Sequence, residues 1–196
     1  MTCDMGCIYH GCMSSETFFR PRYHITPPQG RLNDPNGVFI SPRTGRLHVF
    51  YQHDPAFPFG KKRTGWGHVS AELDTLRWLH HPDALYPDVA YDLDGCYSGG
   101  AVVDGEQVYL FYTGNLKEPT ADGGFARRAT QNRVNAVDPD DLMGGVYRRD
   151  AANPLIDGPA AGYTAHYRDP MITRDPHDSH DGWRMVIGAQ REDETG

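Results

Sequence analysis

The chain has 196 residues, a length that suits one domain better than two. Its 19 Lys and Arg against 26 Asp and Glu give a net charge of −7, which argues against a nucleic-acid partner, because phosphates demand a basic face. The 22 Gly and 15 Pro fall between apolar runs that are rich in aromatic residues, and this composition predicts short strands joined by turns.

Residues 1–19 are expected to form a disordered extension. Three of the four cysteines lie here, but Cys3, Cys7, Cys12 and His10 match no zinc or cluster spacing, so no metal site or cofactor is predicted. The segment lacks the basic start and apolar stretch of a signal peptide, and no run approaches the roughly 20 apolar residues that cross a bilayer. We therefore expect a cytoplasmic location and no membrane partner.

From Arg20 onward a hairpin unit occurs three times, over residues 33–52, 95–112 and 168–187. Each unit begins with small or polar residues, continues as a short apolar strand, turns, and ends in a longer apolar strand. Such patterns indicate β-hairpins, and further short strands are expected near residues 67–70 and 77–80. Repetition at this period predicts an all-β propeller, whose usual blade has four strands.

Polar residues stand at the start of the first strand in each unit. They are Asn33 and Asp34, then Ser98, then Arg168 and Asp169. The first strand of a propeller blade runs nearest the central axis, so these side chains are expected to meet in one polar pocket. Asp-Pro and Asn-Gly pairs also simply make turns. Because two Asp-Pro pairs occupy equivalent places in the repeat, we favour a shared polar pocket over simple turns.

The motifs after the extension resemble, in their order, glycoside hydrolase family 32, which comprises invertases, sucrose-6-phosphate hydrolases and fructan hydrolases. The resemblance covers residues 20–196 and implies a partial five-bladed β-propeller domain, with about the first three blades present in this chain. The motifs that carry it are His24–Pro28, Leu32–Gly37, Phe50–Gln52, Trp66–His68, Asp94–Gly99, Leu110–Asn115, Tyr163–Pro170 and Met185–Gln190.

The resemblance implies retaining hydrolysis of terminal β-D-fructofuranosyl bonds in a small sugar substrate: sucrose, sucrose-6-phosphate or a fructan. Asp34 matches the nucleophile, and Asp169 matches the carboxylate that grips fructose hydroxyls and stabilises the transition state. Retaining glycosidases place their two catalytic carboxyl groups about 5–5.5 Å apart. The positions that match substrate contacts or the pocket rim are Arg31, Leu32, Asn33, Gln52, Trp66, Tyr97, Ser98 and Arg168. Arg31 and Leu32 replace a Trp-Met pair of many members.

The family's acid/base is a Glu in a Glu-Cys pair, and this chain contains no such pair. Glu192 and Glu194 follow the third hairpin too soon to replace it. We therefore expect a chain truncated at its C-terminus that is inactive or nearly so by itself.

Two other functions stay open. One is an arabinan-cleaving five-bladed glycosidase, an inverting enzyme with carboxyl groups about 6.5–9.5 Å apart. The other is a non-catalytic carbohydrate-binding propeller or an inactive gene remnant. The sequence does not predict the oligomeric state.

Two charged clusters of the sequence allow both a functional and a structural interpretation. Five arginines suit either a substrate phosphate or a charged outer surface, and the absence of a phosphate motif favours the surface. The second cluster, of His and Asp, suits a solvated loop better than a metal site. Their members are Arg127, Arg128, Arg133, Arg148 and Arg149, and His177, Asp178, His180 and Asp181.

Overall fold

The computed structural model describes residues 20–21, 23–138, 146–175, 177 and 182–195. The predicted extension over residues 1–19 and most of the His177–Asp181 cluster lie outside the described residues. The described residues form ten β-strands and no helix, which confirms the all-β prediction. No helix that is long and apolar enough to cross a membrane occurs among them.

The first sheet contains four antiparallel strands in chain order: β1 (Arg31–Ile40), β2 (Leu47–Asp54), β3 (Gly65–Ala71) and β4 (Leu79–Leu85). Nearly every residue of β2 and β3 is buried, because these central strands have packed side chains on both faces. Polar residues lead into β1, and apolar residues follow in its second half. The sequence thus places β1 with one end at solvent and the other in the core.

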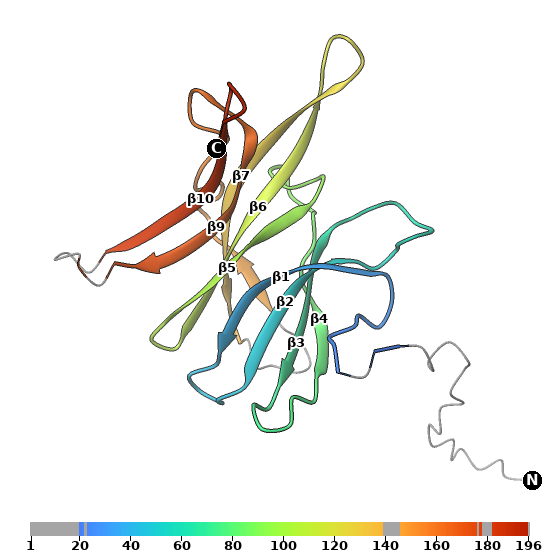
Figure 1. Cartoon of the computed structure of the whole chain (residues 1–196), viewed down its shortest axis with the longest axis vertical. Coiled ribbons are helices and arrows are strands. Elements are labelled where there is room, and N and C mark those ends of the chain that lie inside the picture. The colour runs from blue at the N-terminus through green and yellow to red at the C-terminus, as the bar shows by residue number, and fades with distance from the viewer. Residues whose placement is uncertain (1–19, 22, 139–145, 176, 178–181, 196) are drawn as a thin grey trace, which may run out of the picture.

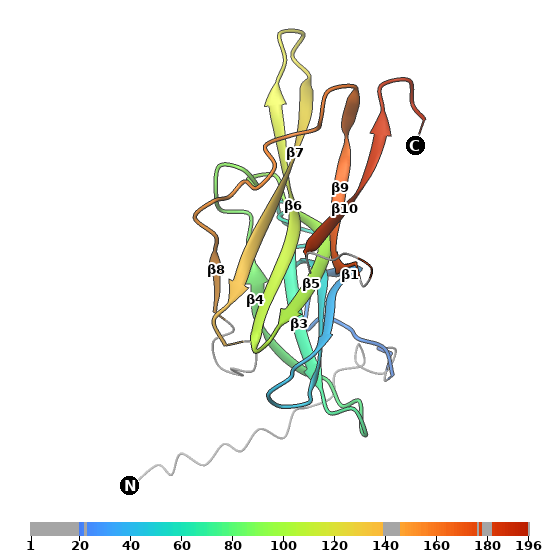
Figure 2. The same cartoon turned by 90° about the vertical axis from the view of Figure 1, so that its left-hand side faces the viewer.

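The second sheet repeats this order with β5 (Cys96–Asp104), β6 (Gln107–Pro119), β7 (Phe125–Ala136) and β8 (Tyr147–Arg149). A tight turn at Asp104-Gly105 joins β5 to β6, and Gly105 has a φ of +60°, which favours glycine. β6 and β7 are long, and their hairpin tip projects beyond the rest of the molecule in Figures 1 and 2.

The third unit consists, within the described residues, of the antiparallel hairpin β9 (Tyr163–Arg174) and β10 (Trp183–Arg191). β1 packs beside β5, and β5 packs beside β9, so the first strands of the three units are neighbours. In Figure 1 the β9–β10 hairpin, the second sheet and the first sheet follow one another across the molecule. The repeated hairpins and their blade-like arrangement agree with the predicted propeller.

The main core lies between the first two sheets. Phe50 and Trp66 from the first sheet pack in one cluster with Leu110 and Tyr112 from the second, and all four are fully buried. Gly37 lets β1 approach this cluster, because it has a φ of +50° and a Cβ there would lie 3.1 Å from the Phe50 ring. The core therefore fixes the position of β1 just beyond Asp34.

Candidate active site

The first strands of the three units line a common pocket of about 310 Å³. Arg31, Asn33 and Asp34 come from β1, Tyr97 comes from β5, and Arg168 and Asp169 come from β9. Gln52 reaches the same pocket from the end of β2. Seven of the ten residues predicted for the site thus line one polar cavity, although they come from sequence positions more than 130 residues apart.

A chain of hydrogen bonds ends on the carboxylate of Asp34. Asn33 Nδ2 donates to Gln52 Oε1 at 3.0 Å, and Gln52 Nε2 donates to Ser98 Oγ at 2.7 Å. Ser98 Oγ then donates to Asp34 Oδ2 at 2.8 Å. Hydrogen bonds to an ionised carboxylate favour its charged form and fix its orientation. The chain of hydrogen bonds therefore fixes the orientation of the Asp34 carboxylate at the pocket wall.

Asp169 is held by its backbone. Its φ of +64° lies in the left-handed region, which Asp tolerates better than most side chains, and its N–H donates to Thr113 Oγ1 at 3.0 Å. Burial raises the pKa of Asp169, and the neighbouring charge of Asp34 raises it further, while Arg168 opposes both effects. The Arg168 Nε atom lies 3.6 Å from Asp169 Oδ2. The site thus holds two carboxylates in unlike surroundings.

Ser98 is joined to the pocket through its bond to Asp34, but Leu32 and Trp66 are placed elsewhere. Trp66 is fully buried in the main core, and its Nε1 donates to the Tyr97 carbonyl at 3.1 Å. Leu32 packs against the second apolar cluster, around Val49 and Val69. The family resemblance implies a substrate contact for Trp66 and a place at the pocket rim for Leu32. The structure puts them behind the pocket wall, because an apolar core offers a large side chain more contact than the polar pocket does.

Four residues of this region were not predicted. Lys62 and Thr64 line the pocket from the connection between β2 and β3. Thr113 and Gln131 lie behind Asp169, where Thr113 Oγ1 donates to Gln131 Oε1 at 2.8 Å and Gln131 Nε2 donates to the Tyr167 carbonyl at 2.8 Å. The basic run of residues 61–63 in an acidic chain is a signal that could have drawn attention to Lys62.

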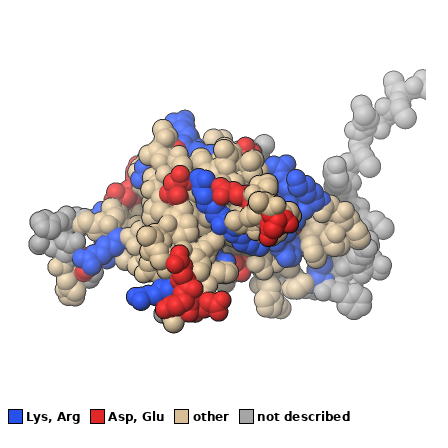
Figure 3. Space-filling model, turned by 90° about the horizontal axis from the view of Figure 1, so that it is seen from above, with Lys and Arg blue, Asp and Glu red and all other residues tan. Residues whose placement is uncertain are grey.

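The five arginines of the middle region do not line this pocket. Arg128 pairs with Glu118 and Asp157, and Arg133 pairs with Asp150. The predicted outer-surface position is wrong for Arg149. This side chain is partly buried, and it forms an ion pair at 2.8 Å with the fully buried Asp92. Acidic and basic side chains are interspersed on the face seen in Figure 3.

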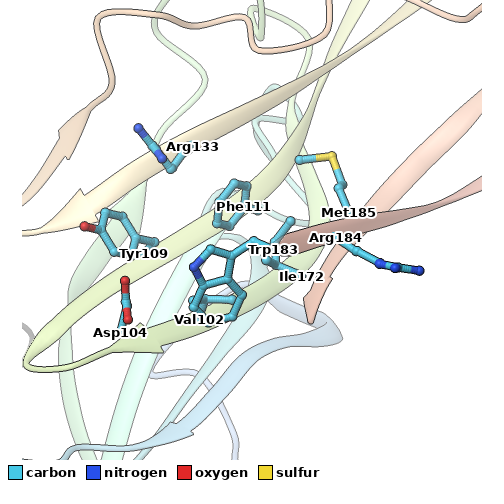
Figure 4. Close-up of a pocket in the computed structure, with 9 residues that line it drawn as sticks. All are labelled: Val102, Asp104, Tyr109, Phe111, Arg133, Ile172, Trp183, Arg184 and Met185. Carbon is cyan, nitrogen blue, oxygen red and sulfur yellow. The ribbon is translucent and has the colours of Figure 1, made fainter. Parts of the chain in front are cut away.

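A second pocket, of about 390 Å³, lies between the second sheet and the β9–β10 hairpin. Figure 4 shows Trp183 beside Phe111 in its middle, with charged residues around them. The Arg174 guanidinium lies 4.3 Å from the centre of the Trp183 ring and bonds Asp104 at 2.9 Å. Of the described residues that line this pocket, Asp104 alone carries a carboxylate, and it is already paired. The first pocket, in contrast, is lined by two carboxylates, Asp34 and Asp169.

Comparison with known proteins gives a consistent result. The glycosyl hydrolases family 32 N-terminal domain matches residues 24–196. Sucrose-6-phosphate hydrolase of Bacillus subtilis is 40% identical over 178 residues, which cover 90% of this chain and 33% of that protein. Beta-fructofuranosidase 1 of Zea mays is 33% identical over 180 residues, which cover 90% of this chain and 25% of that protein.

Solved structures agree with these sequence matches. A beta-fructofuranosidase from Bombyx mori superposes with a TM-score of 0.69 at 34% identity, covering 89% of this chain and 33% of that one. Fructan 1-exohydrolase IIa from Cichorium intybus gives a TM-score of 0.69 at 30% identity, covering 87% of this chain and 30% of that one. The chain thus spans about a third of the length of the relatives it matches.

Proposed function

This chain belongs to glycosyl hydrolase family 32, and from that premise we propose that it supplies the fructosyl-binding part of a β-fructofuranosidase. Its two four-stranded sheets and the β9–β10 hairpin are blades of the family's five-bladed β-propeller. The proposed reaction is retaining hydrolysis of a terminal β-D-fructofuranosyl bond in sucrose, sucrose-6-phosphate or a fructan. The relatives named above include enzymes whose names state these substrate types.

The observation that carries this proposal is the hydrogen-bond chain from Asn33 through Gln52 and Ser98 to Asp34. A nucleophilic carboxylate must be aimed at one atom, and a fixed hydrogen-bond donor holds it in that orientation. Asp34 Oδ2 is held by Ser98, so in our proposal Oδ1 attacks the anomeric carbon of the fructosyl unit.

In the first step the bond from the anomeric carbon to the leaving oxygen breaks, and an ester forms between that carbon and Asp34. The leaving oxygen takes a proton from a general acid. In the second step water attacks the anomeric carbon and gives a proton to the deprotonated general acid, while the ester bond breaks; this restores the Asp34 carboxylate and releases fructose with its configuration retained. We assign the general acid to no residue of this chain, because Asp34 and Asp169 are committed to other roles.

Asp169 is proposed to stabilise the transition state. The anomeric centre develops positive charge there, and a nearby carboxylate lowers its energy while accepting hydrogen bonds from sugar hydroxyls. Because burial raises the pKa of Asp169, its charged form is less stable in the pocket than it would be in water. A cationic transition state would reverse that preference, so the stabilisation would be largest when it is needed.

The decisive experiment is Asp34→Asn in the full-length gene product. Loss of the nucleophile should lower the release of fructose at least about a thousandfold. Asp104→Asn is a matched control, because Asp104 is a half-exposed carboxylate outside the pocket, and it should retain the activity. An Asp34→Asn enzyme with more than a tenth of the original rate would remove Asp34 as the nucleophile.

The stereochemistry of the product separates this proposal from an inverting one. NMR of the first product should show β-fructofuranose before mutarotation. Initial release of the α-anomer would favour the inverting alternative. Sugar binding by the full-length product without any turnover would favour a binding module. A small sugar as the partner, without nucleic acid or membrane, and a cytoplasmic location remain part of the same proposal.

A further inference from the structure

Arg149 holds a buried carboxylate that the proposed reaction does not use. Its Nη1 atom lies 2.8 Å from Asp92 Oδ2 and also donates to the Tyr112 hydroxyl. The Tyr112 hydroxyl in turn donates to the same oxygen of Asp92 at 2.8 Å. Asp92 and Tyr112 are fully buried, and a buried carboxylate needs a cation and donors because water does not solvate it. The three side chains therefore act as one polar unit inside the fold.

This polar unit extends across the second sheet. Arg149 is the last residue of β8, and Tyr112 lies on β6. Asp92 lies four residues before Cys96, which is the first residue of β5. Figure 2 shows β8 and β5 at opposite edges of the second sheet. The ion pair thus ties the outer strand of the sheet to the segment that enters its inner strand.

Arg149 also fixes the connection that leads from β4 into β5. Its Nη2 atom donates to the Tyr86 carbonyl at 2.6 Å and to Asp88 Oδ1 at 2.5 Å. Farther along, the Gly95 N–H donates to the Asp92 carbonyl at 2.8 Å. One guanidinium therefore holds the first part of this connection directly and its last part through Asp92.

The strand that follows this connection carries a donor of the candidate site. Cys96 opens β5, and Ser98, close behind it, donates to Asp34 Oδ2 at 2.8 Å. The Cys96 N–H donates to the Thr64 carbonyl at 2.8 Å, and its thiol donates to Asp92 Oδ2 at 3.5 Å. The start of β5 is thus fixed by the first sheet on one side and by Asp92 on the other.

We propose that Arg149 is a positioning residue for the hydrolysis, which acts through Asp92 and the start of β5 on the hydrogen bond from Ser98 to Asp34. This inference rests on the proposed function and adds to it a residue that does not line the pocket. Without the guanidinium, Asp92 would lose its cation, and the connection would open to let water reach the carboxylate. Ser98 would shift with the start of β5, and a misplacement of about 1 Å in a site can cost about a hundredfold in rate.

The first test is Arg149→Lys in the full-length gene product. Lysine keeps a positive charge beside Asp92 but lacks the planar fork that also bonds Tyr86 and Asp88. We expect kcat for the release of fructose to fall about threefold to tenfold, while KM changes less than about twofold. The loss falls on kcat because the orientation of the nucleophile is used in the reaction step. An unchanged kcat would overturn the proposal.

Arg128→Lys is the matched control. Arg128 belongs to the same sheet, and its partners Glu118 and Asp157 are at least half exposed. Ion pairs of this exposed kind contribute little, so the control should leave kcat and KM as they are. A loss in Arg128→Lys as large as that in Arg149→Lys would mean that any arginine of the sheet has this effect, and it would overturn the specific role of Arg149.

A double-mutant cycle with Ser98→Ala separates positioning from general support of the fold. When Arg149 acts through Ser98, the two substitutions remove the same contribution. The loss of kcat on Arg149→Lys should then shrink to less than about twofold in the Ser98→Ala background. Losses that multiply would mean that Arg149 acts independently of Ser98, which contradicts the proposal.

A third variant removes both charges of the ion pair. Asp92→Asn combined with Arg149→Met leaves no charge of this pair in the core, so its melting temperature should lie above that of Arg149→Met alone. Its kcat should still be lowered about threefold or more, because the link from Arg149 to Tyr86 and Asp88 is lost. Recovery of kcat together with the melting temperature would leave Arg149 with a structural role only and overturn the proposal.

The two proposals fail in different ways. Release of fructose by the unmodified protein, together with an unchanged kcat in Arg149→Lys, would overturn the positioning role and leave the fructosidase proposal intact. No release of fructose from sucrose, sucrose 6-phosphate or a fructan by the unmodified protein would overturn the proposed function itself.

Discussion

The two four-stranded sheets and the β9–β10 hairpin hold the two carboxylates of the site by different means. Asp34 stands on a strand whose continuation enters a core shared by both sheets, with Phe50 and Trp66 fully buried. Asp169 stands on a hairpin with few buried side chains, where Met171 and Val186 are more than half exposed. The hairpin is anchored near the site by two backbone hydrogen bonds: the Asp169 N–H donates to Thr113, and the Tyr167 carbonyl accepts from Gln131. Apolar packing thus positions one carboxylate, and buried polar contacts position the other.

The largest expected effect is the loss of stability on removing a tryptophan ring, and it should differ between the main core and the β9–β10 hairpin. Trp66→Ala should destabilise the fold by about 3–5 kcal/mol, since it empties a closely packed core site. Trp183→Ala on the β9–β10 hairpin should cost far less, because that ring is 42% exposed whereas Trp66 is 0% exposed. Thermal melting of the two full-length variants measures the difference. Equal losses would mean that the hairpin is packed as firmly as the core.

The next prediction concerns the polar anchor of Asp169. Thr113→Val keeps the side-chain shape but removes the hydroxyl that accepts from the Asp169 N–H and donates to Gln131. Each lost partner costs about 1–3 kcal/mol, so kcat/KM should fall about tenfold to a hundredfold. Thr113→Ser should restore most of the loss, because it returns the hydroxyl. A fully active Thr113→Val enzyme would show that the hairpin needs no such anchor.

A smaller loss of activity is expected when the hydrogen-bond donor to Asp34 is removed. Ser98→Ala should lower kcat about tenfold, because a hydrogen bond to a charged group contributes about 1.5–3 kcal/mol. Gln52→Leu breaks the same chain one step earlier. The double variant should therefore lose less than the product of the two single losses, and strictly multiplicative losses would contradict a linked chain.

The sequence predicts the hairpins well, because their signals are local. Turn residues such as Asp104-Gly105 separate apolar runs of strand length, and the described strands follow them. The convergence of Asp34, Ser98 and Asp169 also follows from sequence, once equivalent positions in a repeat are taken to be equivalent in space.

The anchoring residues could not be predicted in this way. Thr113 and Gln131 look like ordinary strand residues, and their partners on β9 lie 56 and 36 residues away in the chain. Trp66 fits a sugar-stacking role and a core role equally well until packing decides between them. Arg149 likewise looks like a surface cation, because nothing local shows that the distant Asp92 will be buried beside it.

The last prediction uses pH to separate the two regions. In the first sheet, His68 lies between Phe50 and His81, with both ring centres 4.3 Å from its own, and it shares a 2.9 Å hydrogen bond with His48. Burial lowers the pKa of His68 to about 2, and the charges of His81 and His48 would lower it in the same direction. The unfolded chain takes up a proton below about pH 6.5 and the folded chain does not. His68 therefore contributes stability above pH 6.5 that is lost as the pH falls, by up to about 1.4 kcal/mol per pH unit.

Two other groups change the stability with pH in the opposite direction to His68. Burial lowers the pKa of His53, but its hydrogen bonds to Asp83 and to the Gln29 carbonyl outweigh burial and raise it. That contribution is present below pH 6.5 and is lost at higher pH. On the hairpin, the raised pKa of Asp169 favours its protonated form, so acid relieves a cost there.

Acid should consequently loosen the first sheet before the β9–β10 hairpin responds. Amide exchange of the full-length product, corrected for intrinsic rates, should show β2 and β3 losing protection between pH 7 and pH 5. His68→Gln should flatten this dependence, even if it lowers the overall stability, because the variant no longer titrates. The His53→Gln variant should steepen the loss, since it removes the group that opposes it. Loss of protection that begins in β9 and β10 would mean that the hairpin, and not the buried histidines, limits the acid stability of the site.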